Sequence, residues 1–452
     1  MSVTKETLRK VMIVGSGGRE HAAVKAFLNS NKVKTLYVAH GNDGMFNGHN
    51  EIDGRLQKVD LSIERQEDIQ KLAAISQEMG VDLIFVGPEK PLSLGIVDVF
   101  ENEGLAIVGP SKKASMLEGS KAWAKDVMRT LNIPIPDYVN FSDPDKAKDY
   151  IKSQPNPVVV KASGLAAGKG SIVTTSKQEA LEAVDLIMVQ KKFGEAGNQI
   201  VIEQRLDGEE FSFFAFTDGE TVLPMAWARD YKRSHDKDEG LNTGGMGAYS
   251  PYRENEQELT DTVMKQIAQP LVQGCREKFG FTYKGILYIG GTFLKENGKI
   301  NPYVFEVNVR MGDPEAQVIY PRLKTDLVDI SMGIIEGNLG QLGRLDWDQN
   351  YHVCVCATSG RTRGKNGWYK GYPQRYATGK EISGLNQISP DSLVFHSGTK
   401  WDTEKQCFIT DGGRVLSIVS SGVTLGEAGN KAYQEIAKVD FQGLHYRKDI
   451  GT

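Results

Sequence analysis

Short apolar runs alternate with amphipathic stretches over the first 110 residues. The apolar runs cover residues 10–14, 35–39, 82–86 and 105–108, and each ends near a glycine or a proline. Residues 19–27 have helical spacing. This alternation predicts a parallel sheet with crossover helices. Ligands bind beyond the carboxyl ends of such strands, which makes three loops candidate sites: residues 15–20, 87–89 and 109–111.

The middle of the chain changes to a mixed pattern. Its expected helices cover residues 112–132, 177–189 and 254–279. Its expected strands cover residues 157–161, 171–174, 199–203, 285–294 and 302–309, with two more joined at Asp218-Gly219 and a turn at 296–298. Residues 228–250 are polar and rich in glycine, which predicts a long loop. Beyond about residue 330 we expect short strands, glycine turns and one late helix.

Composition excludes several classes of protein. The 54 Lys and Arg residues nearly balance the 58 Asp and Glu residues, for a formal net charge of −4. This balance argues against a general nucleic-acid binder and against attraction to anionic membranes. No stretch has the apolar length of a membrane span, the N-terminus lacks the apolar core of a signal peptide, and the four cysteines form no disulfide framework. We therefore expect a soluble cytoplasmic protein.

The first loop candidate, Gly15-Ser-Gly17-Gly18-Arg19-Glu20, joins a strand to a helix. A helix N-terminus presents backbone N–H groups and a positive dipole end to an anion. A dinucleotide fingerprint would need glycine where Glu20 stands and an acidic residue near Ala39, so an NAD site is disfavoured. A phosphate site for a smaller ligand and a structural turn both stay open.

A second glycine-rich segment, Lys161-Ala-Ser-Gly164-Leu-Ala-Ala-Gly168-Lys169-Gly170, lies between two expected strands. It is not a Walker loop, because neither Ser nor Thr follows Lys169 and no helix begins there. A flexible glycine loop can still fold over a triphosphate while its lysines neutralise charge. The alternative is a glycine-rich hairpin with surface lysines.

Polar residues alternate at the end of a later strand, where Glu306, Asn308 and Arg310 should point to one face. A carboxylate and an amide oxygen two positions apart suit Mg²⁺, which takes its other ligands from water and phosphate. Arginine next in line can bind a transferring phosphoryl group. A solvent-facing strand would show the same alternation, but the lysine and glycine loop upstream favours the metal site.

Charges of both signs fill residues 229–239, directly before the glycine-dense segment 242–251. Together they could hold a zwitterion or cover an active site, and a solvated charged surface is the alternative. The histidines show no metal-ligand spacing.

Six motifs follow one another along residues 10–451: Val14-Gly-x-Gly-Gly-Arg-Glu-His21, Val86-Gly-Pro-Glu89, Leu117-Glu-Gly-Ser-Lys121, the segment 161–170, the segment 242–251, and Arg447-Lys-Asp-Ile-Gly451. This set resembles the glycinamide ribonucleotide synthetase family of the ATP-grasp superfamily. The resemblance implies an α/β and α+β multidomain fold. Its parts would be a Rossmann-like pre-ATP-grasp domain (1–118), a two-lobed ATP-grasp fold (119–328, mobile lobe about 133–204) and a small β-rich C-terminal domain (329–452).

The resemblance also implies a reaction. An ATP-dependent ligase would join glycine to 5-phospho-D-ribosylamine through glycyl phosphate, giving glycinamide ribonucleotide, ADP and phosphate in purine biosynthesis. ATP is then a substrate, with Mg²⁺ or Mn²⁺ as the metal. We expect a monomer with small-molecule partners only, and transient contact with neighbouring purine-pathway enzymes stays open. Two other interpretations also stay open: another ATP-grasp ligase or carboxylase, and a nucleotide-binding regulator without turnover.

Site residues follow from the same resemblance. The ATP site would comprise Lys121, Lys161, Gly164, Gly168, Lys169, Gly170, Glu203, Leu206 and Glu210, with 164–170 as the lid, 203–206 at the adenine and Glu210 at the ribose. Substrates would contact Gly17, Gly18, Arg19, Glu20, Pro88, Glu89, Gly245, Met246 and Gly247. Catalysis would fall to Lys161, Arg310 and Asp230, and metal binding to Glu306 and Asn308.

Some positions depart from the family pattern. The strand before Glu306 reads Tyr288-Ile-Gly-Gly-Thr292, without the acidic residue that often supplies a third metal ligand. Ser163 replaces the usual Asp, Met311 replaces an aromatic residue, and a basic insertion occupies about residues 361–370. The metal site would therefore rely on two protein ligands.

Overall fold

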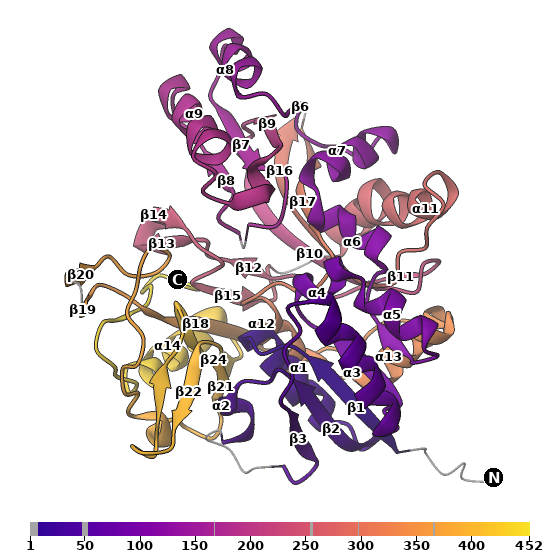
Figure 1. Cartoon of the computed structure of the whole chain (residues 1–452), viewed down its shortest axis with the longest axis vertical. Coiled ribbons are helices and arrows are strands. Elements are labelled where there is room, and N and C mark those ends of the chain that lie inside the picture. Colours follow the sequence, from indigo (N-terminus) through magenta and orange to yellow (C-terminus); the bar gives the residue numbers. More distant parts are fainter. Residues whose placement is uncertain (1–7, 48–52, 167, 254–255, 297, 365–366) are drawn as a thin grey trace.

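The structure is a computed structural model that describes residues 8–47, 53–166, 168–253, 256–296, 298–364 and 367–452 (Figure 1). Parts of several predicted features lie outside these residues. They are Ala167 of the glycine loop, residues 254–255 of an expected helix, Asn297 of an expected turn, and Lys365 and Asn366 of the basic insertion.

A sheet of five parallel strands forms the N-terminal part, as the alternating pattern predicts, in the order β3-β2-β1-β4-β5. The strands are β1 (Arg9–Val14), β2 (Val33–Ala39), β3 (Leu56–Val59), β4 (Leu83–Val86) and β5 (Ile107–Val108). Helices connect them: α1 (Gly18–Leu28), α2 (Asp43–Phe46), α3 (Gln66–Glu78), α4 (Glu89–Leu94) and α5 (Ile96–Asn102). The ends of β1 and β4 meet at one edge, where Gly87 N donates to Val14 O at 3.0 Å.

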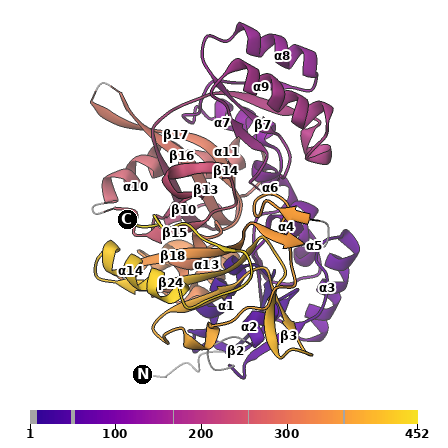
Figure 2. The ribbon, with the colours of Figure 1, turned by 90° about the vertical axis from the view of Figure 1, so that its left-hand side faces the viewer.

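A small lobe stands at one end of the molecule, at the top of Figures 1 and 2. Its antiparallel sheet has the order β6-β9-β7-β8, from β6 (Tyr138–Phe141), β7 (Val158–Ala162), β8 (Ser171–Val173) and β9 (Ile200–Gln204). Helices α8 (Pro144–Ser153) and α9 (Lys177–Val184) close a separate core over this sheet. The lobe therefore has its own core, built from residues such as Ile151, Val160 and Ile202.

A second antiparallel sheet lies below the small lobe and carries the predicted metal ligands. Its order is β11-β10-β16-β17, from β10 (Glu209–Thr217), β11 (Val222–Pro224), β16 (Gly285–Glu296) and β17 (Lys299–Asn308). Helices α10 (Gln257–Val263) and α11 (Gln269–Glu277), joined by a π-helical turn, contribute buried side chains to the core that this sheet shares. The two expected strands between 210 and 227 and the pair 285–294 and 302–309 are confirmed.

The helix expected at 112–132 is wrong in one respect, because it is broken into α6 (Lys112–Gly119) and α7 (Lys121–Thr130). Ser120 between them is extended, and its side chain accepts a hydrogen bond from Trp123 N, as an N-cap residue does. The break places Glu118 and Lys121 at facing helix ends beside the second sheet.

The long loop expected at 228–250 is also wrong. The segment forms β12 (Arg229–Asp230), a hairpin of β13 (Arg233–His235) and β14 (Glu239–Asn242), and β15 (Gly247–Ser250). Strand β15 pairs with β18 (Tyr351–Ser359), about a hundred residues further along the chain. Polar composition hides such strands, because the hairpin is exposed and the partner of β15 is distant in sequence.

Short strands with one late helix complete the chain, as expected. The main sheet runs β12-β15-β18-β24-β21, with β25 (Leu444–His445) beside β18. Its other strands are β21 (Leu393–His396) and β24 (Arg414–Gly422), and α14 (Leu425–Ile436) packs on it. Smaller elements are α12 (Ala316–Ile319), α13 (Leu327–Glu336), β19 (Thr362–Gly364), β20 (Gly367–Tyr369), β22 (Thr399–Asp402) and β23 (Cys407–Thr410).

Two further findings concern membranes and thiols. In the described ranges, no helix has the length and apolar character to cross a membrane. The four cysteines are free thiols, and three of them are buried: Cys275, Cys354 and Cys356.

The N-terminal and C-terminal parts are joined by a buried polar cluster. Asn42 donates to Ser397 O at 2.7 Å and to Thr399 O at 3.0 Å, and His21 Nδ1 accepts from His396 N at 3.0 Å. Gly44 packs directly on the His396 ring, so closely that a Cβ would overlap it. Any side chain at residue 44 must therefore push the two parts of the molecule away from each other.

We expect Gly44→Ala to lower the free energy of unfolding by about 1–3 kcal/mol, because overpacking forces this interface apart. Urea denaturation measures the change. Gly54→Ala is the matched control, since a Cβ at Gly54 meets nothing within 4 Å. Equal stability of the two variants would show that the interface yields without cost.

Candidate active site

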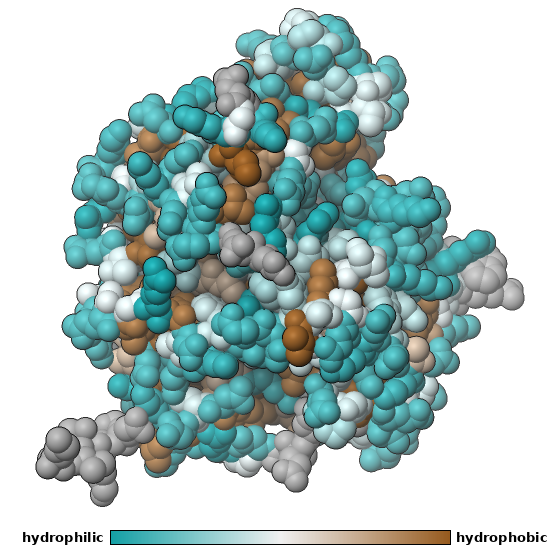
Figure 3. Space-filling view, turned by 180° about the vertical axis from the view of Figure 1, so that it is seen from behind, coloured by the Kyte–Doolittle hydropathy of each residue, from teal (hydrophilic) through white to brown (hydrophobic). Residues whose placement is uncertain are grey.

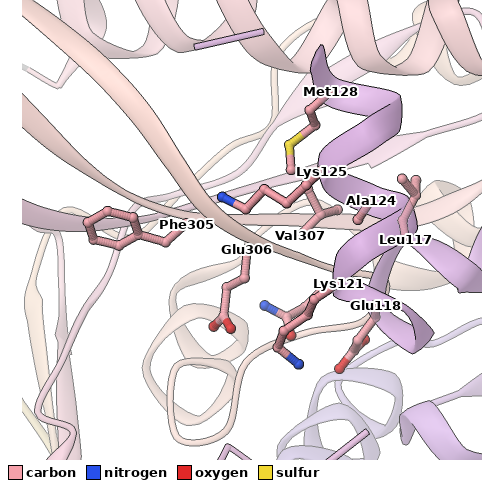
Figure 4. Close-up of a pocket in the computed structure, with 10 residues that line it drawn as sticks. Leu117, Glu118, Lys121, Ala124, Lys125, Met128, Phe305, Glu306 and Val307 are labelled. Atoms are coloured by element: carbon pink, nitrogen blue, oxygen red, sulfur yellow. The ribbon is translucent and has the colours of Figure 1, made fainter. Parts of the chain in front are cut away.

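A pocket lies where α6 and α7 face β17 (Figure 4). Lys121 and Glu118 reach into it from the helices, and Glu306 reaches in from the strand. The remaining lining residues are Leu117, Ala124, Lys125, Met128, Phe305, Val307 and Asn308. Polar and charged groups therefore meet on a floor of apolar side chains.

A buried carboxylate, Glu203 of β9, holds two lysines at the rear of this site. Lys161 Nζ lies 2.8 Å from Glu203 Oε2, and Lys125 Nζ lies 3.3 Å from Oε1. Both ammonium groups also donate to β17, Lys161 to Phe305 O at 3.1 Å and Lys125 to Val304 O at 3.0 Å. Because Lys161 and Glu203 belong to the small lobe, this cluster fixes the lobe against the second sheet.

Lys125 was not singled out by sequence. Burial lowers the pKa of Lys125 to about 8, and Glu203 opposes that shift. The available signal was its spacing, four residues after Lys121 on a helix, which puts both lysines on one face. Lys121 behaves similarly, since burial lowers its pKa while Glu306 opposes the change.

Glu306 and Asn308 share a face of β17, as predicted, although the strand is not regular. Register shifts between Gly290 and Gly291, so Phe305 is an extra residue in a bulge. Arg310 lies beyond the end of the strand, yet its Nη2 reaches Asn308 Oδ1 at 3.2 Å. The three predicted residues are thus brought together.

The Glu306 carboxylate is surrounded by cations. Burial would raise its pKa, but Lys232, Lys121, Lys161 and Arg310 lower it to about 2. It accepts no hydrogen bond from the part of the chain that the structure describes, and Lys232 Nζ is 3.9 Å from Oε1. A carboxylate that is ionised, partly exposed and free of close donors is available to a cation.

One carboxylate and one amide oxygen are hard ligands of the kind that Mg²⁺ and Mn²⁺ accept. Among the described residues, no group of three His, Cys, Asp or Glu side chains could hold a metal. Opposite Glu306, Gly290 leaves room, since a Cβ there would lie 3.2 Å from Glu306 Cγ. The residues therefore fit a divalent ion that takes most of its ligands from elsewhere.

Arg310 begins a chain of alternating charges that runs into the N-terminal sheet. Its Nη2 donates to Glu118 Oε1 at 2.6 Å, and its Nε lies 3.3 Å from Glu89 Oε2. Arg19 Nη2 approaches the same Glu89 oxygen at 3.6 Å. Burial would raise the pKa of Glu89, but Arg310 and Arg19 lower it to about 2. Glu118 is a second residue that motif reasoning left without a role.

The glycine turn before α1 is closed by the Glu20 side chain, from the first turn of that helix. Glu20 Oε2 accepts from the N-cap Gly17 N at 2.7 Å, which is the Glu half of a capping box, and its other oxygen accepts from Arg19 Nε at 2.6 Å. Glu20 is buried, and Pro88 packs close to this turn. Residues 17–20 and 88–89 are thus neighbours, as expected for two loops at one sheet edge.

On the opposite side, Lys232 lies between two carboxylates, 3.9 Å from both Asp230 Oδ2 and Glu306 Oε1. Burial raises the pKa of Asp230, and Lys232 opposes that rise. Burial and Asp230 together raise the pKa of Glu315 to about 7, and Tyr288 donates to Glu315 at 3.0 Å. Sequence analysis assigned no role to Glu315 or Tyr288, although Tyr288 begins the stretch compared with the metal-ligand strand of the family.

The glycine-dense loop 243–247 is held by the C-terminal part. Arg414 Nη1 donates to Gly244 O at 3.0 Å, and its Nη2 pairs with Asp313 at 2.9 Å. Gly244 N donates to the Tyr372 hydroxyl at 2.9 Å. Gly245 has φ +120, and a Cβ there would overlap Pro314. Neither Arg414 nor Tyr372 was predicted, because both are far from this loop in sequence.

The predicted lid approaches this glycine-dense loop. Gly168 has φ +72, and a Cβ there would lie 3.6 Å from Thr243 O. Lys169 Nζ lies 5.8 Å from the centre of the Tyr372 ring. Gly164 N donates to Ala196 O at 3.2 Å, which anchors the loop at its start. Gly170 at its end is packed, since a Cβ would lie 2.6 Å from Ala166 Cβ.

Four other predicted site residues do not line the pocket: Leu206, Glu210, Met246 and Gly247. Met246 is fully buried, and Gly247 of β15 pairs with Val355 of β18, and neither residue lines the pocket. Leu206 lies between β9 and β10 outside the lining of the pocket, and Glu210 is exposed on β10. Their roles at the nucleotide stay predictions.

Comparison with known proteins matches the chain along most of its length. Three domain families match: the phosphoribosylglycinamide synthetase N domain at residues 9–118, its ATP-grasp (A) domain at 119–316 and its C domain at 368–452. Phosphoribosylamine–glycine ligase of Halalkalibacterium halodurans is 44% identical, covering 98% of this chain and 96% of that protein. That of Archaeoglobus fulgidus is 41% identical, with 98% and 99% covered.

Solved structures agree. Phosphoribosylamine–glycine ligase of Thermotoga maritima matches with a TM-score of 0.79 and 31% identity, covering 97% of this chain and 99% of that one. A biotin carboxylase domain of Hydrogenobacter thermophilus 2-oxoglutarate carboxylase matches with a TM-score of 0.68 at 15% identity, which shows a shared fold only.

We expect Glu89→Gln to lower the free energy of unfolding at neutral pH by about 2 kcal/mol, and to do so less in acid. The folded-state pKa of Glu89 is lowered from 4.5 to about 2, so its contribution is complete above pH 4.5 and disappears as the pH falls toward 2. Urea denaturation near neutral pH and at about pH 3 measures both values.

Glu78→Gln, an exposed position, controls for the change in net charge. A loss of stability in Glu89→Gln that is the same at both pH values would contradict the ionic explanation.

Proposed function

The chain belongs to the phosphoribosylglycinamide synthetase family, and on that premise we propose that it joins glycine to 5-phosphoribosylamine, converting ATP to ADP and phosphate. The product is glycinamide ribonucleotide, an intermediate of purine biosynthesis. The observation that carries this function is the convergence of Lys121, Lys161 and Arg310 on the ionised Glu306 carboxylate. Such a surface has the charge that a metal-bound polyphosphate requires.

We place the ATP phosphates between the small lobe and β17. Lys121 and Lys161 would neutralise the phosphate charge, and the loop 164–170 would cover the phosphates. Lys161 is already held by Glu203 and the Phe305 carbonyl, so its ammonium needs no rearrangement to meet a phosphate. Adenine at residues 203–206 and ribose at Glu210 complete the proposed nucleotide site.

Glu306 and Asn308 would hold the divalent ion, Mg²⁺ or Mn²⁺. When bound, such an ion would supply positive charge against the charge that develops on the transferred phosphoryl group.

In the proposed reaction, a carboxylate oxygen of glycine attacks the γ-phosphorus of ATP, and the bond to the ADP oxygen breaks. Lys161 and Arg310 stabilise the charge on the phosphoryl oxygens. The amine of phosphoribosylamine then attacks the carbonyl of glycyl phosphate, and phosphate leaves with the oxygen that came from glycine. Asp230, whose pKa is raised by burial beside Lys232, accepts the proton that this amine releases.

The two remaining substrate positions follow from where the charges lie. We place glycine beside Lys232 and the loop 245–247, because Lys232 Nζ lies 3.9 Å from Glu306 Oε1. The phosphoribosyl group lies beyond Arg310, at Gly17–Glu20 and Pro88-Glu89, where Arg19 supplies positive charge. No protein nucleophile is required, since positioning and charge stabilisation are sufficient.

We also propose a cytoplasmic monomer that acts on small molecules alone. On the face shown in Figure 3, hydrophobic residues are scattered among hydrophilic ones without a broad apolar surface. Contact with other enzymes of the pathway would then be transient.

The function is tested by incubating the enzyme with ATP, Mg²⁺, glycine and phosphoribosylamine, omitting each in turn. We expect glycinamide ribonucleotide and phosphate in equal amounts only in the complete mixture. If ATP is consumed only with a different acid or amine, the proposed substrates are wrong, but the ligase chemistry is retained. Nucleotide binding without turnover in any mixture would favour a regulatory protein.

We expect Glu306→Gln to lower kcat at least about 100-fold, because metal-based charge stabilisation is worth several kcal/mol. Steady-state phosphate release measures this, with Glu277→Gln on an exposed helix position as the control. Near-normal turnover of Glu306→Gln at saturating Mg²⁺ would remove Glu306 from the metal site.

We expect Gly168→Val to impair turnover more than stability, because a branched side chain disfavours φ +72 and would stiffen the lid. The ratio of ADP formed to glycinamide ribonucleotide formed should rise, since an open lid admits water to the acyl phosphate. Gly194→Val, in the same lobe with φ +58 and open space around it, is the control. An unchanged ratio with a lower unfolding midpoint would make the loop merely structural.

A further inference from the structure

The motif Arg447-Lys-Asp-Ile-Gly451 takes no part in the proposed reaction, yet it contains one of the most buried charged side chains in the described chain. The Arg447 side chain is 1% exposed. Its guanidinium pairs with Asp449 through two hydrogen bonds of 2.8 and 2.7 Å, and it lies 4.8 Å from the centre of the Tyr231 ring. A group buried and paired in this way is held in one position.

The same guanidinium binds the β13–β14 hairpin (residues 233–242). Arg447 Nη1 donates to Asp238 Oδ1 at 2.8 Å and to Arg233 O at 3.1 Å. His445 Nε2 lies 2.8 Å from Ser234 O, at the first strand of the hairpin. Arg447 and His445 together thus contact both the first strand of the hairpin and its tip.

The tip of the hairpin has an unfavourable backbone. Lys237 and Asp238 have φ of +58 and +54, which are left-handed values that residues other than glycine rarely adopt. Two bonds between a backbone N–H and a carboxylate join this turn to the C-terminal segment, since Lys237 N donates to Asp449 Oδ2 and Lys448 N donates to Asp236 Oδ1, both at 2.8 Å. The hairpin has little else to hold its tip, because its residues from 235 to 241 are exposed.

The base of the hairpin enters the active site. Lys232 precedes it, and Thr243 follows it. Thr243 donates to Lys232 O from its backbone at 2.7 Å and from its hydroxyl at 2.8 Å, and Gly245 N donates to the same hydroxyl at 2.9 Å. A displacement of the hairpin therefore moves Lys232 and the glycine-dense loop together.

We propose that Arg447 and Asp449 are positioning residues, which hold the β13–β14 hairpin so that Lys232 and residues 243–245 face Glu306. This inference rests on the proposed function, because it assigns these residues to the glycine side of the site. The nucleotide side is held separately, by Glu203 with Lys161 and Lys125. Loss of the Arg447 contacts should therefore affect glycine and spare ATP.

Two variants test the proposal in the full chain. Arg447→Lys keeps the charge, but its ammonium has only three N–H donors. It therefore cannot replace all four hydrogen bonds that the Arg447 guanidinium makes to Asp449, Asp238 and Arg233 O. Asp238→Asn weakens the same contact at a side chain that is 64% exposed, so it tests the hairpin even if the buried change impairs folding. Glu239→Gln, the next residue on the hairpin and also exposed, is the matched control.

We expect both variants to raise the KM for glycine at least about fivefold while the KM for ATP stays within about twofold, since small displacements of positioned groups weaken their action strongly. Hydrogen exchange of backbone amides in residues 231–245 should accelerate in both, and Glu239→Gln should change neither measurement.

Faster exchange with an unchanged KM for glycine would overturn the proposal, and so would equal increases in both KM values. If the unaltered enzyme forms no glycinamide ribonucleotide, the proposed function fails first. Hydrogen exchange then still decides whether the hairpin is held by Arg447, and unchanged exchange in Asp238→Asn would overturn that.

Discussion

Buried positive charge is the constraint on which this structure depends. Lys125, Lys161 and Arg310 are removed from water, which is unfavourable unless each meets an acceptor. Glu203 at the rear of the pocket and Glu118 in its lining supply acceptors, and backbone carbonyls of β17 and Met311 supply others. The cations are thereby fixed before any ligand arrives. The Glu306 side chain stays 33% exposed and, among the described residues, accepts no hydrogen bond. Under the proposed function, a polyanion and a divalent ion would complete the site.

The same contacts explain how the parts of the chain cooperate. Glu203 ties the small lobe to the second sheet, and Glu89 ties the N-terminal sheet to Arg310. The C-terminal part holds the glycine-dense loop through Arg414 and Tyr372. Each part thus contributes charges or backbone to a site that none of them forms alone, and the substrate positions that we propose on different parts share this network.

Sequence reasoning located much of this arrangement. Alternating apolar runs predicted the parallel sheet, because hydrophobic period and turn residues are local signals. Period-two alternation placed Glu306 and Asn308 on one face, although the bulge at Phe305 left no trace in the pattern. The break at Ser120 had a local signal, a serine at a helix N-cap, that the helical pattern outweighed.

Partners distant in sequence were beyond such reasoning. Glu118 meets Arg310 across 192 positions, and Arg414 meets Gly244 across 170. Strand β15 looked like a loop because its partner, β18, lies far along the chain. The local sequence around a residue indicates whether that segment tends to form a helix or a strand. The contacts named here form only when distant parts of the chain pack together.

On the proposed function, this charge network directs phosphoryl transfer to the carboxylate of glycine. Glycine labelled with ¹⁸O in its carboxyl group tests that claim directly, with the released phosphate analysed by mass spectrometry. We expect one labelled oxygen in each phosphate, since the glycine oxygen that attacks phosphorus leaves with the phosphate. Phosphate without label, formed together with glycinamide ribonucleotide, would contradict an acyl phosphate route.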